Sequence, residues 1–305
     1  MKFLVTGATG FLGRHLCKAL EGQGHTVAKV SSKVCDLSKD GMLNQFDGIK
    51  FDYIYHLAVW VQAGDFPSLY QGDIWLMNQK INTNVLSWWK ESQMQAKLIA
   101  MGTSCAYAPG ADLKEENYLN GLPHPSLFSY AMTKRMLYNG LVSLNKQYGM
   151  KYLCFAFSAL YGTEYYHKEK QCHFIIDLIR KIAGAKAGGE SPVLWGDGYQ
   201  KRELLFVTDL VDIMLNFMEH EENKLVNVSS GEEHTIRHFA KLICDEVGYD
   251  FESIQYDISK YVGAKSKSLS NSLLKSVAPS FTFTPLQEGL KKTISWYLGQ
   301  DLIKS

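Results

Sequence analysis

Residues 2–13 read KFLVTGATGFLG, and this segment decides the fold of the chain. The apolar run 2–6 is typical of a buried strand, and the periodic run 11–20 is typical of a helix. Between them Gly7, Gly10 and Gly13 have the spacing G-x-x-G-x-x-G, a variant of the dinucleotide fingerprint. Glycine lets the backbone approach a pyrophosphate, whose charge then rests on the amides of the helix N-terminus. The segment predicts a dinucleotide site; the alternative is a strand-to-helix turn that merely needs glycine.

Strand and helix patterns continue to alternate through the first half of the chain. Strands are expected near 26–30, 53–58, 97–101 and 152–157, and helices near 73–95 and 130–148. This alternation predicts an α/β fold, a Rossmann-type doubly wound parallel sheet that is covered on both faces.

The rhythm changes after residue 160, where shorter strands appear between the helices. We therefore expect two interleaved domains. A dinucleotide-binding domain would contain residues 1–165 plus 204–230, and a smaller C-terminal substrate domain would contain residues 166–203 plus 231–305.

Composition excludes several classes of protein. The 305 residues carry a formal net charge of +1, which argues against binding nucleic acid through a broad basic field. The 6 cysteines form no C-x-x-C pair and are too sparse for a disulfide framework, which favours a reducing compartment. No apolar run approaches the roughly 18 residues of a membrane span, and residues 1–7 leave no room for a signal peptide. We expect a cytoplasmic protein without membrane contact and without a metal site.

A second signal is Tyr130 with Lys134 at the start of a predicted helix. Residues four apart share a helix face, so Lys134 can lie near the Tyr130 phenol and lower its pKa toward the working range of an acid or base. The motif alone carries little weight, because three other Tyr and Lys pairs have this spacing. Context selects Tyr130, because the strand before its helix ends in Thr103 and Cys105, at the sheet edge where the glycine loop lies.

Together these motifs resemble a known family, the extended short-chain dehydrogenase/reductases that act on nucleotide sugars, or NAD-dependent epimerase/dehydratase family. Within it the chain is most similar to the GDP-L-fucose synthases, over nearly its whole length. The segments that carry this closer likeness are 102–107, 145–149, 160–162, 193–203 and 226–237. Dehydratases of the family have an Asp-Glu pair where this chain has Ser104-Cys105, which argues against 4,6-dehydration.

The resemblance implies an oxidoreductase that reduces a 4-keto sugar nucleotide at C4, with a GDP-linked 4-keto deoxy sugar as the expected substrate. Tyr130 would give its proton to the developing alkoxide, Lys134 would support Tyr130 and the nicotinamide ribose, and Thr103 would bond the same oxygen. Cys105 and His173 would be the acid and base that invert C3 and/or C5, as in the GDP-L-fucose synthases. Alternatively, Cys105 is a small buried residue and His173 a helix-cap histidine.

The cofactor is expected to be NADPH, with NADH less favoured. Segment 27–33, at the end of the second strand, has no acid to accept from a ribose hydroxyl, and Arg14 follows the glycine loop. The expected cofactor-binding residues are Gly7, Thr9, Gly10, Phe11, Leu12, Gly13, Arg14, Ser31, Ser32, Asp36, Leu37, Leu57, Ala58, Tyr130 and Lys134. Asp36 would contact the adenine edge or, alternatively, cap a helix.

The sugar nucleotide would be held by Ser104, Arg180, Trp195 and Arg202, by resemblance to the family. Arginine suits this role because its planar guanidinium can make two contacts to a diphosphate. Two departures from the family leave the sugar and the base open. Segment 156–162 lacks the Asn that usually precedes Tyr-Gly, and segment 264–270 lacks the Pro-Arg-Lys run.

Three interpretations therefore stand beside one another. The first is a C4 reductase that also epimerises. The second is a C4 reductase alone, for a GDP-heptose or another deoxy sugar, in which Cys105 and His173 are idle or only orient the substrate. The third is a non-catalytic dinucleotide-sensing protein. Because relatives commonly pair through two helices of the sheet domain, we also expect a homodimer, with Trp88-Trp89 either in the core or at that interface.

Overall fold

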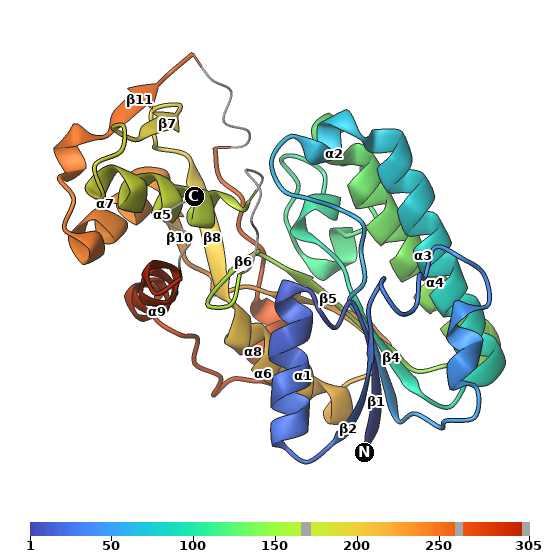
Figure 1. Cartoon of the computed structure of the whole chain (residues 1–305). Coiled ribbons are helices and arrows are strands. Elements are labelled where there is room, and N and C mark those ends of the chain that lie inside the picture. The colour runs from blue at the N-terminus through green and yellow to red at the C-terminus, as the bar shows by residue number, and fades with distance from the viewer. Residues whose placement is uncertain (166–171, 260–264, 301–305) are drawn as a thin grey trace. The chain divides into compact units, whose positions relative to one another are not determined.

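A six-stranded parallel sheet forms the first part of the structure (Figure 1). The computed structural model describes residues 1–165, 172–259 and 265–300. The strands of this sheet are β1 (Lys2–Thr6), β2 (Thr26–Val30), β3 (Tyr53–His56), β4 (Lys97–Met101), β5 (Tyr152–Phe157) and β9 (Lys224–Val228). They pair in the order β2-β1-β3-β4-β5-β9. The strand order therefore reverses between β1 and β3, which is the topological switch point of a doubly wound sheet.

Helices lie on both faces of this sheet, as predicted. Tyr55 and His56 are consecutive in β3 and so point to opposite faces. The Tyr55 hydroxyl donates to the Met214 carbonyl of α6 (Val207–His220; 3.3 Å), whereas the His56 ring bonds to Asn82 of α3 (Gln71–Ser92; 3.0 Å). Figure 1 shows α4 (Phe128–Tyr148) beside α3, and α1 (Phe11–Gly22) follows β1 directly. The short helix α2 (Phe66–Leu69) precedes α3. This arrangement confirms the Rossmann-type α/β fold.

The adjacent tryptophans of α3 lie in the core. Trp89 is fully buried, and its indole N–H donates to the Ala96 carbonyl (2.9 Å). The Trp88 indole N–H donates to the carboxylate of Asp47 (2.7 Å). Both side chains therefore serve the packing of the sheet unit, and a homodimer stays a prediction.

A second set of elements is built around two smaller sheets. One has the order β10-β8-β6, and the other pairs β11 with β7. The strands are β6 (Ala159–Tyr161), β7 (Val193–Trp195), β8 (Lys201–Phe206), β10 (Glu233–Thr235) and β11 (Gln255–Asp257), and the helices are α5 (Phe174–Lys186), α7 (Ile236–Val247), α8 (Ser272–Val277) and α9 (Leu286–Leu298). None of the helices within the described residues is long and apolar enough to cross a membrane.

The chain divides into two units that are interleaved in sequence. The first contains Met1–Phe157 and Leu210–Val228, and the second contains Ser158–Asp209 and Ser229–Ser305. Residues 158–165, 204–209 and 229–230 were grouped with the first sheet in the sequence-based ranges, but they belong to the second unit. For 158–165 the reason is that β6 pairs with β8. The assignment of the cofactor to the first unit and the sugar nucleotide to the second stays a prediction.

Gly289 lies so close to Tyr161 that a side chain at position 289 should destabilise the protein. A β-carbon on Gly289, in α9, would lie 2.1 Å from the hydroxyl of Tyr161, which is itself buried. Gly289→Ala should therefore lower the free energy of unfolding, measured in urea, by about 1–3 kcal/mol, because a rigid buried ring has to move.

The matched control is Gly184→Ala in α5, where an added β-carbon would meet nothing within 4 Å. This change should raise the free energy of unfolding by up to about 1 kcal/mol, because alanine favours the helix. Equal effects of the two substitutions would contradict the expected clash.

Candidate active site

The carboxyl ends of β1, β3 and β4 lie next to one another in the sheet. Thr6 pairs with His56 across β1 and β3, and His56 pairs with Ala100 across β3 and β4. The segments that follow these three strands therefore meet at one edge. In open α/β sheets this edge, at the switch point, is where ligands bind.

The glycine loop after β1 has the geometry of a pyrophosphate cradle. Gly7 has a φ of +66°, and a β-carbon on Gly13 would lie 2.2 Å from the Gly7 carbonyl oxygen. Thr9 and Gly10 are exposed, and Gly10 occupies the N-cap of α1 without a side-chain capping bond. The Arg14 guanidinium donates to the Thr9 carbonyl (2.5 Å). The Gly10 amide itself donates to the Gly7 carbonyl (2.9 Å), and the start of α1, which has no side-chain cap, fits a dinucleotide phosphate.

Four of the other expected cofactor contacts lie in the segment that follows β2. Of these, Ser31 is half-buried and Ser32 is exposed just beyond β2. The Asp36 carboxylate accepts from the Ser38 hydroxyl (2.7 Å) and amide (3.1 Å), which lowers its pKa. These bonds form a local turn and not the helix cap that was the alternative, since the next helix, η1 (Met42–Phe46), has Gly41 at its N-cap. An adenine contact by Asp36 stays a prediction. Leu37 is buried.

A short 3-10 turn after β4, η2 (Ser104–Ala106), carries the candidate catalytic residues. Its N-cap Thr103 is buried, and the Thr103 hydroxyl accepts from the Cys105 amide (3.2 Å). Burial, and next the nearby Cys105 thiol, raise the pKa of Tyr130, while a side-chain hydrogen bond with Thr103 opposes this shift. Tyr130, Thr103 and Cys105 therefore come together at the ligand edge, and the Tyr130 phenol is protonated at neutral pH.

Lys134 lies one turn after Tyr130 on α4 and is buried. Its ammonium donates to the Met101 carbonyl at the end of β4 (2.8 Å), and burial lowers its pKa to about 8. We expected Lys134 to lower the pKa of Tyr130. In this structure the opposing contact comes from Thr103 instead, and burial determines the direction of the shift.

The candidate residues of the second unit come from three elements, α5, β7 and β8. His173 is exposed at the N-cap of α5, and its amide donates to the Tyr165 hydroxyl (3.3 Å). Arg180, also on α5, pairs with Asp177 (2.5 Å). Trp195 is 55% exposed on β7, and Arg202 lies on β8, where burial lowers its pKa. Since Cys105 belongs to the first unit and His173 to the second, their action as a pair stays a prediction.

A protein family model, the NAD dependent epimerase/dehydratase family, matches residues 3–229. The chain belongs to this family. It is 29% identical to a GDP-L-fucose synthase from Dictyostelium discoideum, over 97% of this chain and 94% of that protein. It is also 29% identical to a GDP-L-colitose synthase from Yersinia pseudotuberculosis, over 98% and 99% of the two chains.

A solved structure of similar fold is a GDP-L-fucose synthetase from Naegleria fowleri bound to NADP. Its TM-score is 0.85 at 25% identity, with 97% of this chain and 94% of that chain covered. For a member of the NAD dependent epimerase/dehydratase family, the glycine loop described above is the expected seat of a nicotinamide dinucleotide. The resemblance inferred from the sequence is confirmed.

A buried histidine that sequence reasoning missed, His56, connects the end of β1, next to the glycine loop, to α4. The Thr6 hydroxyl accepts from the two backbone amides that follow β3 (both 3.1 Å), so its proton goes to Nδ1 of His56 (2.9 Å). His56 Nε2–H then donates to the Asn82 side-chain oxygen (3.0 Å), and the Asn82 amide donates to the Thr133 carbonyl of α4 (3.4 Å). The only sequence signal was a polar residue that ends an apolar strand.

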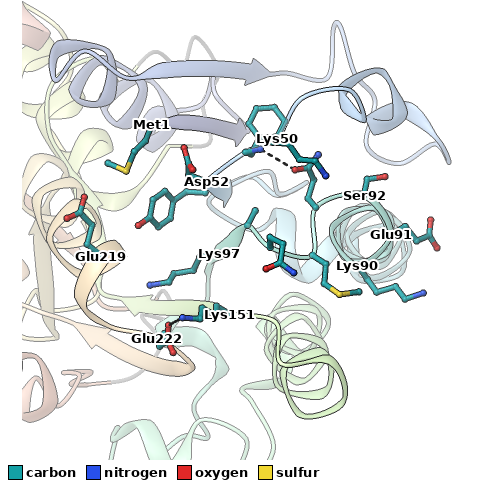
Figure 2. Close-up of a pocket in the computed structure, with 16 residues that line it drawn as sticks. Met1, Lys50, Asp52, Lys90, Glu91, Ser92, Lys97, Lys151, Glu219 and Glu222 are labelled. Carbon is teal, nitrogen blue, oxygen red and sulfur yellow. Dashed lines mark hydrogen bonds and ion pairs between the residues drawn. The ribbon is translucent and has the colours of Figure 1, made fainter.

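A cavity of about 690 Å³ lies at the opposite end of the sheet (Figure 2). Its lining includes Lys97 and Lys151, at the amino ends of β4 and β5. Lys151 pairs with Glu222 (2.9 Å), and the Lys97 ammonium donates to the Met218 carbonyl (2.6 Å). Because ligands of open α/β sheets bind at the carboxyl ends of strands, we do not assign the active site to this cavity.

The buried His56 should make stability depend on pH. Burial lowers the pKa of His56 from 6.5 to about 4. The unfolded chain therefore binds more protons between these values, and the free energy of unfolding should fall as pH drops from about 6.5 toward 4. In His56→Gln this contribution is absent, so urea unfolding at pH 7 and pH 5 should differ less than in the wild type.

His220→Gln is the control, because His220 is exposed at the end of α6. This variant should keep the wild-type dependence on pH. If His56→Gln also kept it, a neutral, buried His56 would be ruled out.

Proposed function

We propose that this protein reduces a GDP-linked 4-keto deoxy sugar at C4 with NADPH and that it also inverts C3 and/or C5. The observation that carries the proposal is the meeting of Tyr130, Thr103 and Cys105 at the carboxyl edge of the sheet, where the glycine loop also lies. Similarity to a GDP-L-fucose synthase and a GDP-L-colitose synthase over almost the whole chain supports the substrate class.

The reduction uses residues of the first unit. Bound NADPH supplies the hydride for C4. As the C4 carbonyl becomes an alkoxide, the Tyr130 phenol donates its proton to that oxygen and later regains one from solvent. The raised pKa of Tyr130 suits this direction, because the phenol is protonated before the step. Thr103 hydrogen-bonds the same oxygen and the Tyr130 phenol. Lys134 is proposed to support the nicotinamide ribose.

The epimerisation uses one residue from each unit. A carbonyl acidifies the protons on its neighbouring carbons, so inversion needs a base on one face of the carbon and an acid on the other. Cys105 and His173 are the proposed pair. His173 is exposed, and half-buried Cys105 lies beside Tyr130, so neither side chain is sealed inside its own unit.

The choice of NADPH over NADH rests on the segment after β2. Ser31, Ser32 and Lys33 follow the strand without an acid that would repel a ribose phosphate. Arg14, at the start of α1, adds a positive charge beside the glycine loop. For the sugar nucleotide we propose Ser104, Arg180, Trp195 and Arg202, with the arginines facing the diphosphate. Arg180 would then have to exchange or share its ion pair with Asp177.

A C4 reductase without epimerase activity is the second candidate. Segment 156–162 departs from the family pattern near the sugar, and it contains Ser158, whose hydroxyl is buried without a hydrogen-bond partner among the described residues. A buried hydroxyl of this kind costs free energy unless a ligand or water satisfies it. Ser158 could therefore accept a different sugar from that of the GDP-L-fucose synthases.

Replacing Tyr130 tests the reduction. Tyr130→Phe should lower the rate of NADPH oxidation with a GDP-4-keto sugar by about a hundred- to ten-thousandfold, because the proton donor is lost. NADPH binding, followed by fluorescence titration, should be almost unchanged and tighter than NADH binding. Tyr148→Phe is the control, since Tyr148 is exposed at the far end of the same helix. An unaffected rate in Tyr130→Phe would overturn the assignment.

Deuterium exchange in heavy water distinguishes a reductase that also epimerises from a C4 reductase alone. With GDP-4-keto-6-deoxymannose and no NADPH, an epimerase should exchange deuterium into C3 or C5, as measured by mass spectrometry. Cys105→Ser and His173→Gln should each lower this exchange while leaving NADPH binding intact. NADPH consumption without any exchange would establish a plain C4 reductase.

A further inference from the structure

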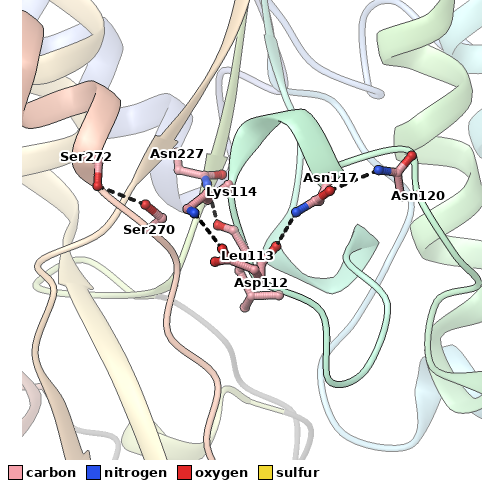
Figure 3. Close-up of polar contacts among 8 residues, drawn as sticks. All are labelled: Asp112, Leu113, Lys114, Asn117, Asn120, Asn227, Ser270 and Ser272. Carbon is pink, nitrogen blue, oxygen red and sulfur yellow. Dashed lines mark hydrogen bonds and ion pairs between the residues drawn. The ribbon is translucent and has the colours of Figure 1, made fainter.

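Hydrogen bonds hold residues 107–121, a loop between β4 and α4, to the first unit at two places. Near its middle, the Asn227 side-chain amide at the end of β9 donates to the Leu113 carbonyl (2.8 Å), as Figure 3 shows. The Asn227 backbone amide donates to Glu115 (2.9 Å), and the Tyr107 hydroxyl donates to the Asn227 side chain (2.7 Å). Asn227 is fully buried, so this side of the loop is fixed to the sheet.

The other side of the loop closes around Arg135, which follows Lys134 on α4. Arg135 is 5% exposed, and every N–H of its guanidinium donates to a backbone carbonyl. Ala106 accepts from both Nε (2.9 Å) and Nη2 (2.5 Å), Asn120 accepts from Nη2 (2.9 Å), and Leu119 and Gly121 accept from Nη1 (3.2 and 2.6 Å). Five carbonyl contacts compensate the burial of this charge, which would otherwise be costly.

The convergence of three successive carbonyls on one side chain depends on Gly121. Gly121 has a φ of +62°, and a β-carbon there would lie 2.9 Å from the Ala108 side chain. A left-handed residue turns the chain sharply, which lets neighbouring carbonyls aim at the same point. The loop therefore forms a socket, residues 119–121 with Ala106, that matches the fork of an arginine and not the single ammonium of a lysine.

The socket includes the last residue of the catalytic turn. Ala106 ends η2 and follows Cys105 directly, and two donors from one guanidinium fix the direction of its carbonyl. The beginning of the same turn has a separate support, because the Tyr118 hydroxyl accepts from the Thr103 amide (3.2 Å). Tyr118 of the loop thus holds Thr103, and Arg135 of α4 holds Ala106, the residue next to Cys105.

We propose that Arg135 is a positioning residue that holds the Cys105 thiol in place through the Ala106 carbonyl, and so supports proton exchange on the sugar more than hydride transfer. The proposal rests on the proposed epimerase function. Arg135 itself touches backbone carbonyls and acts only through the turn. Thr103 and Tyr130 keep their own contacts, so reduction should depend on Arg135 less.

The test compares Arg135→Lys with the wild type. Lysine has three donors and cannot fill the socket, so deuterium exchange into GDP-4-keto-6-deoxymannose should fall about ten- to hundredfold. NADPH oxidation with the same sugar should fall much less, and NADPH affinity should be unchanged. Alkylation of Cys105 by iodoacetamide should also proceed at a changed rate. Mass spectrometry of the Cys105 peptide follows this reaction, and the measurement needs no substrate.

A second pair of variants controls for the possibility that Arg135→Lys merely disturbs folding. Gly121→Ala should reproduce the exchange defect by distorting the socket while Arg135 is intact. Gly110→Ala is the matched control, because Gly110 lies in the same loop with a φ of +77° and an added β-carbon would meet nothing within 4 Å. Gly110→Ala should keep wild-type exchange and alkylation of Cys105.

Two results would overturn the proposal. One is wild-type alkylation and exchange in Arg135→Lys. The other is an equal loss of exchange, hydride transfer and NADPH binding, which would make Arg135 a residue of the fold alone. If the wild type exchanges no deuterium, the epimerase function fails, but a changed alkylation rate in Arg135→Lys and Gly121→Ala would still support the positioning of Cys105.

Discussion

The close approach of the first helix to the end of the first strand is the constraint on which the ligand edge depends. A β-carbon on Gly13 would lie 2.2 Å from the Gly7 carbonyl oxygen, and one on Gly7 would lie 2.9 Å from the Ala58 amide nitrogen. Side chains at these positions would push α1 away from β1 and β3. The Thr6 hydroxyl adds to this closeness, because it accepts from both amides that follow β3. The glycine loop and the η2 turn share one edge because their strands lie in one parallel sheet, and the close packing keeps α1 against that edge.

Burial, more than charge pairing, controls the ionisation of the site. It raises the pKa of Tyr130, lowers that of His56 to about 4 and lowers that of Lys134 to about 8. These directions give a protonated phenol and a neutral imidazole at neutral pH. A site of this kind needs only a few local donors for an anionic ligand, which agrees with a net charge of +1.

The two units of the chain contribute differently to the two proposed activities. The residues proposed for reduction, Thr103, Tyr130 and Lys134, all belong to the first unit, whereas His173 belongs to the second. Reduction alone and reduction with epimerisation therefore share these three residues of the first unit. The two activities differ in their use of Cys105, which only epimerisation needs. The position of Cys105 depends on the turn that Arg135 supports.

The sequence by itself determined the fold class, the glycine loop and the choice of Tyr130 among several similar pairs. These features follow from local periodicity and from the rule that strands of a parallel sheet end at one edge, so they need no knowledge of the chain's path. The tertiary structure alone decided the roles of His56, Tyr118 and Arg135. Tyr118 and Arg135 bond to backbone amides and carbonyls, which every residue carries, so the sequence does not mark which ones they will meet. His56 bonds to the side chains of Thr6 and Asn82, which are far from it in the sequence. Only the folded path of residues 107–121 brings four carbonyls onto one guanidinium.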